Sequence, residues 1–81
     1  MATVHREAGI SFRVYPHDHG PPHVHACIGR GYAKLSLPSE DEPVRVLRIV
    51  GRLTTTEIVK AVSIVQANAE LMRLGWKRFH G

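Results

Sequence analysis

Four histidines lie within nine residues of this chain, in the segment His-Asp-His-Gly-Pro-Pro-His-Val-His that spans residues 17–25. Imidazole changes charge near neutral pH and is also a common metal ligand. The segment therefore concentrates the groups that could do chemistry, which are His17, His19, His23 and His25. Three interpretations compete: a metal site, an acid-base pair, and a structural support for the turn.

In the first interpretation the histidines bind a metal ion. His23, His25 and Cys27 alternate onto one face of a predicted strand, and His17 or His19 could complete a tetrahedral set from the loop. Residues two apart in a strand lie roughly 6 to 7 Å from each other, so three collinear positions cannot all reach one ion. We therefore predict no metal ligand and no cofactor, and keep a metal-binding domain as an alternative.

In the second interpretation two imidazoles transfer protons on RNA, one at the 2′-hydroxyl and one at the leaving oxygen. His19 and His23 are the catalytic candidates, because they bracket a stiff Gly-Pro-Pro turn that could fix their separation. Arg13 or Lys34 would stabilise the phosphate charge. A metal-independent ribonuclease is therefore an alternative function, and whether the chain is an enzyme stays open.

In the third interpretation the histidines hold the turn. Pro21 and Pro22 remove two amide donors, and ring nitrogens of His19 and His23 could bond to the backbone groups that remain. His25 would pack against tyrosines. This structural interpretation is the one that we favour for the cluster.

Period-two alternation of apolar residues predicts the strands that must position these side chains. The predicted strands span residues 10–15, 23–28, 32–37 and 44–50. The glycine-rich segment 29–31 predicts a tight turn, and the acidic segment 38–43 predicts an exposed loop. In the last predicted strand the apolar residues do not alternate strictly. The sequence therefore leaves two options for this strand, a β-bulge or burial on both faces.

A helix is predicted to follow, because Thr54 and Glu57 have the spacing of a capping box. Apolar residues then recur every three or four positions and form one stripe: Ile58, Ala61, Val62, Val65, Ala69 and Met72. Gly75 is predicted to cap the carboxyl end of this single long helix. Trp76 is predicted to cover the core rather than to stack on a nucleobase.

These elements predict a single α+β domain over residues 1–81, a four-stranded antiparallel β-meander with one long C-terminal helix packed on one face. The opposite face of the sheet would carry the polar side chains. Cys27 and the residues that we predict to bind a ligand share it: Arg13, Tyr15, His23, His25, Tyr32 and Lys34. Cationic, aromatic and imidazole groups together suit contacts to phosphates and bases, and the same face could form a homodimer.

The charge distribution favours an anionic partner. The chain has 81 residues, with eleven Lys and Arg, seven Asp and Glu, and a net charge of +4 at pH 7. Three of the seven acids are Glu40, Asp41 and Glu42, so the rest of the chain sets eleven basic residues against four acids. A surface of this kind attracts a polyanion or an acidic protein.

The sequence also predicts where the protein works. No apolar stretch approaches the roughly 20 residues that span a bilayer, and the first residues lack the apolar core of a signal peptide. Cys27 is the single cysteine and cannot form an internal disulfide, which fits a reducing compartment. We predict a cytoplasmic location and no membrane partner.

Several motifs resemble one known family. They are Gly9-Ile10, Tyr15, the string Asp18-His19-Gly20-Pro21-Pro22-His23-Val24-His25-Ala26, and Leu74-Gly75-Trp76. Together they resemble the small prokaryotic proteins grouped as the domain of unknown function 4160. Val24 stands where that family commonly has an aromatic residue, which weakens the idea of base stacking at this position. Members of that family often occur beside another small uncharacterised protein, so the resemblance implies such a partner, in a pairing that looks like a toxin-antitoxin module.

From the residues and the resemblance together we predict a small basic binding module. It would act through the polar face of the sheet on RNA or on a small partner protein, as one component of a toxin-antitoxin-like pair.

Overall fold

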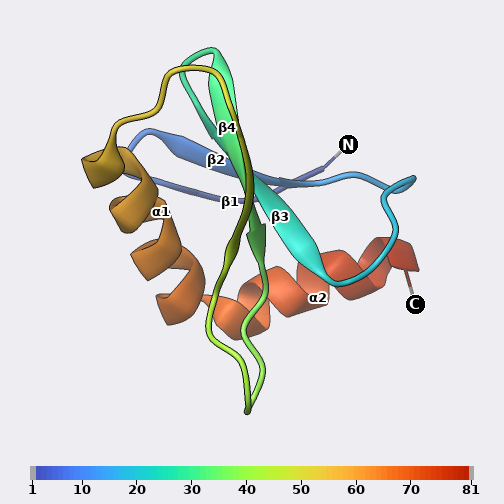
Figure 1. Ribbon diagram of the computed structural model, residues 1–81. Coiled ribbons are helices and arrows are strands. Elements are labelled where there is room, and N and C mark those ends of the chain that lie inside the picture. The colour runs from blue at the N-terminus through green and yellow to red at the C-terminus, as the bar shows by residue number, and fades with distance from the viewer. Residues whose placement is uncertain (1, 81) are drawn as a thin grey trace.

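The computed structural model describes residues 2–80 and contains one antiparallel sheet and two helices (Figure 1). The strands are β1 (Ala2–Glu7), β2 (Ile10–Val14), β3 (His23–Ile28), β4 (Gly31–Ser36) and β5 (Val46–Val50). The helices are α1 (Thr55–Ala67) and α2 (Ala69–His80). The strands lie in sequence order across the sheet, so the predicted α+β meander is confirmed in its connectivity.

The prediction of four strands is wrong by one, because β1 adds a strand at the edge of the sheet. It pairs with β2, and the register shifts between Thr3 and His5. This irregularity breaks the alternation that marks the other strands, and half of β1 is exposed. Without a regular apolar face, a strand gives little signal in the sequence.

The inner strands carry the core on one face, as their alternation predicts. Every second residue of β2 and β4 is buried, and the two strands contribute Phe12, Val14, Ala33 and Leu35. The core is completed from β3 and the helices by Val24, Ala26, Ala61, Ile64, Val65, Met72 and Trp76. Because the core lies on this side, the other face of the sheet is left to the polar residues.

The register of β5 is resolved by a bulge, one of the two options that the sequence leaves open. Lys34 lies opposite Arg48, whereas the next residue, Leu35, lies opposite Val46. Leu47 is therefore the extra residue in the strand. The strand forms the second edge of the sheet, and four of its five residues are exposed.

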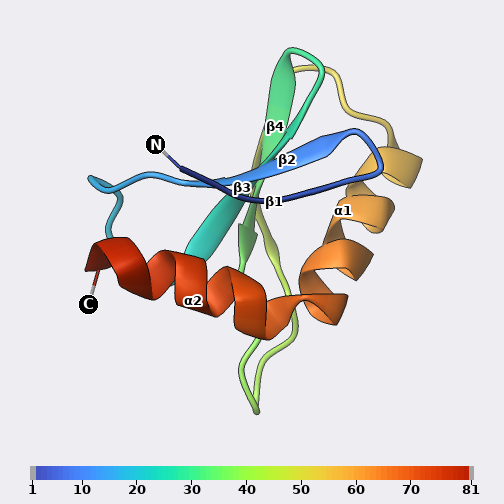
Figure 2. The same cartoon turned by 180° about the vertical axis from the view of Figure 1, so that it is seen from behind.

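The prediction of one long helix is wrong, because the helical segment breaks at Asn68. Thr54 and Glu57 form the predicted capping box at the start of α1, with Thr54 Oγ1 accepting from the Glu57 amide at 3.1 Å. At the other end, the Asn68 side chain donates to the Ile64 carbonyl at 2.8 Å and ends the helix. The chain then turns sharply into α2, which packs on β1, β2 and β3 (Figure 2).

Gly75 does not cap a helix as predicted, because it lies inside α2 against β1. A Cβ atom at this position would overlap the Val4 side chain and lie 2.9 Å from Val4 Cβ. The glycine thus lets the strand approach the helix closely. The next residue, Trp76, is buried, which confirms its predicted place in the core.

Neither helix is long and apolar enough to cross a membrane, among the residues that the structure describes.

Candidate functional site

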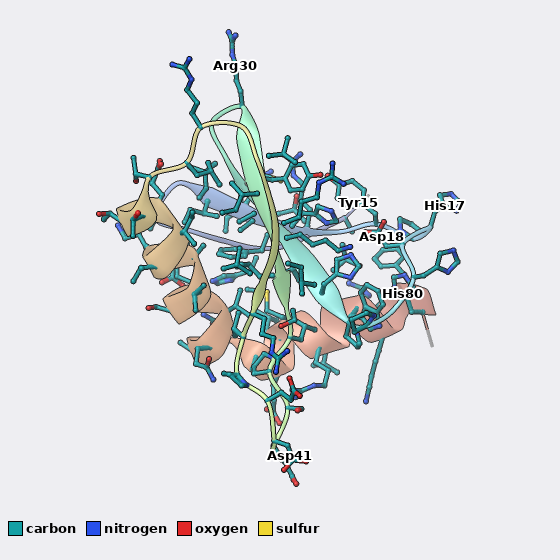
Figure 3. The ribbon with its side chains drawn as sticks, viewed as in Figure 1. Tyr15, His17, Asp18, Arg30, Asp41 and His80 are labelled. Atoms are coloured by element: carbon teal, nitrogen blue, oxygen red, sulfur yellow. The ribbon has the colours of Figure 1, made fainter. Side chains whose placement is uncertain are left out.

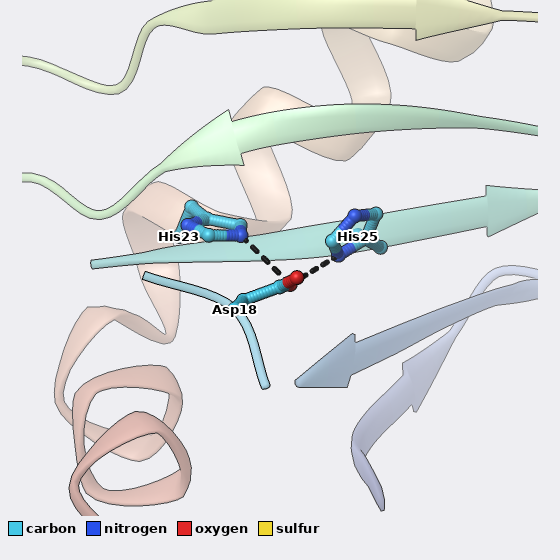
Figure 4. A group of neighbouring side chains, drawn as sticks. All are labelled: Asp18, His23 and His25. Atoms are coloured by element: carbon cyan, nitrogen blue, oxygen red, sulfur yellow. Dashed lines mark hydrogen bonds and ion pairs between the residues drawn. The ribbon is translucent and has the colours of Figure 1, made fainter. Parts of the chain in front are cut away.

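The loop between β2 and β3 returns Asp18 to the start of β3. The Asp18 amide donates to the Tyr15 carbonyl at 3.2 Å, which folds the loop back on itself. Its carboxylate then lies between His23 and His25, which share one face of β3 (Figure 4). Asp18 Oδ2 is 3.0 Å from His23 Nε2 and 3.7 Å from His25 Nδ1. One carboxylate therefore joins two of the four clustered histidines.

His23 supports the turn from inside the protein. Its side chain is 1% exposed, and its Nδ1 donates to the Pro21 carbonyl at 2.8 Å. The ring lies 5.0 Å from that of Trp76, which stacks on His80 at 3.6 Å. The structural interpretation is thus confirmed for His23. His80 takes part as well, and its Nδ1 bonds to the Trp76 carbonyl at 3.0 Å.

His25 packs against two tyrosines, as the structural interpretation expects. Its ring centroid lies 4.7 Å from that of Tyr15 and 5.0 Å from that of Tyr32. Burial lowers the pKa of His25, Asp18 opposes this effect, and His23 and Lys34 add to it. The buried Nδ1 of this ring has no hydrogen-bond partner among the described residues.

The other two clustered histidines lie apart from this group. His17 and His19 are exposed on the loop, and His17 points away from the sheet at its outer end (Figure 3). No hydrogen bond of the described residues links His19 to His23 or to a backbone group of the turn. The geometry does not bring the two catalytic candidates together, because His19 is exposed on the loop and the His23 side chain is 1% exposed.

Three of the six residues predicted to bind a ligand, Arg13, His25 and Lys34, lie next to one another across the polar face of the sheet, whereas His23 is buried. Arg13 lies opposite His25, His25 opposite Lys34, and Lys34 opposite Arg48. We call these four residues the cationic row. Arg13 and Lys34 are half-buried, Arg48 is exposed, and a buried Nε of Arg13 has no partner among the described residues. The two tyrosines flank the row through their contacts with His25.

Sequence reasoning missed two residues of this arrangement, Asp18 and Arg48. The sequence does not assign Arg48 to a face, because the bulge at Leu47 decides which way the side chain points. Asp18 stands between two histidines in the sequence, and an acid in this position indicates a possible carboxylate partner for an imidazole. Its partners are nevertheless the histidines five and seven positions later, which only the fold of the loop brings near.

Comparison with known proteins gives one match. The family described as a domain of unknown function, DUF4160, matches residues 9–77 of the chain. No curated protein and no solved structure matches the chain.

Proposed function

The chain belongs to the DUF4160 family, whose match covers residues 9–77 of its 81 residues, and we propose that it binds RNA through the cationic row of its sheet. The family brings no known activity with it, so the proposal rests on the row itself. The observation that carries it is the register that places Arg13, Lys34 and Arg48 side by side on three strands around His25.

The spacing of the row suits a polyanion. Neighbouring strands lie about 4.8 Å apart, so the row extends over about 14 Å from Arg13 to Arg48. Asp41 lies at the far tip of the loop between β4 and β5 (Figure 3), and Glu42 of this loop is paired with Arg45. The acids of the loop are thus held away from the cationic row, which keeps an attractive potential for phosphates.

The side chains around the row can distinguish RNA from a simple polyanion. The planar guanidinium of Arg13 can bind a phosphate through two nitrogens. Tyr15 and Tyr32 are half-buried, and a tyrosine ring is a group on which a base can stack. Together these groups support contacts to both the backbone and the bases of a single strand.

Removing one charge from the row should weaken RNA binding. For Lys34→Gln and for Arg13→Gln we expect a loss of about tenfold in affinity, equivalent to about 1.4 kcal/mol, because each removes a charged contact to phosphate. The slope of log K against log salt should also fall by about 0.7 for each variant. Fluorescence anisotropy with a labelled RNA of about 16 nucleotides, measured over a series of salt concentrations, tests both effects.

The matched control is Lys60→Gln, which removes an exposed lysine from α1. This variant should bind RNA as the unchanged protein does. An equal loss of RNA affinity in Lys34→Gln, Arg13→Gln and Lys60→Gln would contradict the proposal. RNA binding that does not depend on salt would contradict it as well. The absence of any RNA binding would instead favour a small partner protein, as in a toxin-antitoxin-like pair. Cleavage of the RNA in EDTA, lost in His19→Ala or in a His23→Ala variant that is still folded, would favour the ribonuclease.

A further inference from the structure

We propose that Asp18, His23 and His25 bind a divalent transition-metal ion of the zinc class, with one coordination position left open. One carboxylate oxygen and two ring nitrogens of these residues lie within 4.8 Å of one another. Two imidazoles and one carboxylate are a donor set that such ions accept. The site shares His25 with the cationic row, whereas the proposed contacts to RNA phosphates come from the arginines and the lysine of the row.

The hydrogen bonds of His23 are the first argument for a cation. The Pro21 carbonyl can only accept, so His23 Nδ1 must carry the hydrogen at their 2.8 Å contact. In a neutral ring the other nitrogen, Nε2, then directs a lone pair at Asp18 Oδ2, 3.0 Å away. Two lone pairs face each other stably only if a proton or a metal ion lies between them. The Pro21 carbonyl also fixes the ring, as outer partners of metal-binding histidines do.

His25 favours a metal ion over a proton. A proton shared by Asp18 and His23 satisfies those two residues alone and leaves the buried Nδ1 of His25 without a partner. This nitrogen lies 3.7 Å from the same Asp18 oxygen, too far for a hydrogen bond. An ion between the three atoms would give each of them a partner at once.

The distances fit the coordination geometry. Ligand atoms about 2.1 Å from a tetrahedral ion lie about 3.4 Å from each other. The separations from Asp18 Oδ2, 3.0 Å to His23 and 3.7 Å to His25, fall on either side of that value, and the two ring nitrogens lie within 4.8 Å of each other. The limit on collinear strand positions does not apply here, because Asp18 comes from the loop rather than from β3. Asp18 is also 32% exposed, so the fourth position can open toward solvent.

The test is a titration of the untagged full chain with Zn²⁺ after dialysis against EDTA. Calorimetry should give one ion per chain, and an excess of Zn²⁺ should raise the melting temperature, because the ion binds the folded state. Asp18→Asn and His25→Gln should each weaken binding by at least about 100-fold, since loss of an outer partner alone costs 10- to 100-fold. Co²⁺ should give the visible absorption of a tetrahedral site in the unchanged protein but not in Asp18→Asn or His25→Gln.

The matched control is a chain that carries both His17→Ala and His19→Ala, which removes two histidines of the same segment from exposed positions. It should keep the affinity and the stoichiometry. Loss of binding in this control, with binding kept in Asp18→Asn, would overturn the proposal, and so would an unchanged protein that binds no Zn²⁺. Melts in EDTA verify that Asp18→Asn, a change of the same shape, is folded. RNA binding measured in EDTA separates this result from the proposed function.

Discussion

Replacement of His23 with alanine is expected to lower the free energy of unfolding by about 3 kcal/mol or more. The side chain is among the largest that are fully buried, and its ring lies against Trp76. Alanine would leave a cavity beside the tryptophan and remove the donor of the Pro21 carbonyl. The loop that carries Asp18 would also lose its direct hydrogen bond to β3. Urea denaturation in EDTA, where no metal contributes, measures the effect.

His19→Ala is the control, because His19 belongs to the same motif but is exposed. Its effect should stay within about 0.5 kcal/mol. A similar loss of stability in both variants would show that the turn depends on its histidines as a group. An unchanged midpoint for His23→Ala would contradict the interior position of the ring.

Replacement of Gly31 with alanine should cost about 3 kcal/mol, because it separates two strands. Gly31 begins β4, and a Cβ atom there would overlap the carbonyl oxygen of Val50 in β5. It would also lie 3.2 Å from the Cα of Gly51, which has a φ of 89°. Both of these atoms belong to the backbone, so no change of side-chain rotamer can relieve the overlap. The midpoint of urea denaturation should fall accordingly.

Gly29→Ala is the matched control in the same turn. Gly29 has a φ of 58°, but a Cβ atom there meets nothing within 4 Å. The substitution should therefore cost only the roughly 1–2 kcal/mol of a left-handed conformation. A Gly31→Ala variant that is no less stable than Gly29→Ala would show that β4 and β5 lie further apart than the structure places them.

Local patterns in the sequence predict the part of the fold that depends on local physics. The alternation in β2 and β4 reports which residues face the core, because each strand is buried on one side, whereas in β3 the fold also buries His23 on the opposite face. The capping box of Thr54 and Glu57 is likewise contained within four residues. Such features need no knowledge of the remaining chain, and each is confirmed.

The features that the sequence does not reveal depend on contacts between distant segments. The apolar stripe continues through the break at Asn68, because Val65 and Met72 reach the same core from two helices. In the sequence, Gly75 has the features of a helix end. Only the structure shows that Val4, which is 71 positions earlier in the chain, packs against it. The pairing of Asp18 with two histidines has the same cause, since the loop must first fold back.

The open edge at β5 has a consequence for the solution behaviour of the protein. Val46, Leu47 and Ile49 are each more than 40% exposed, on a strand whose outer backbone groups have no neighbouring strand. Edges of this kind invite pairing with a second chain, and natural proteins interrupt them with charge. Arg48 is the charge within this strand. A variant that neutralises this charge is therefore expected to aggregate more readily than one altered at Arg13 or Lys34.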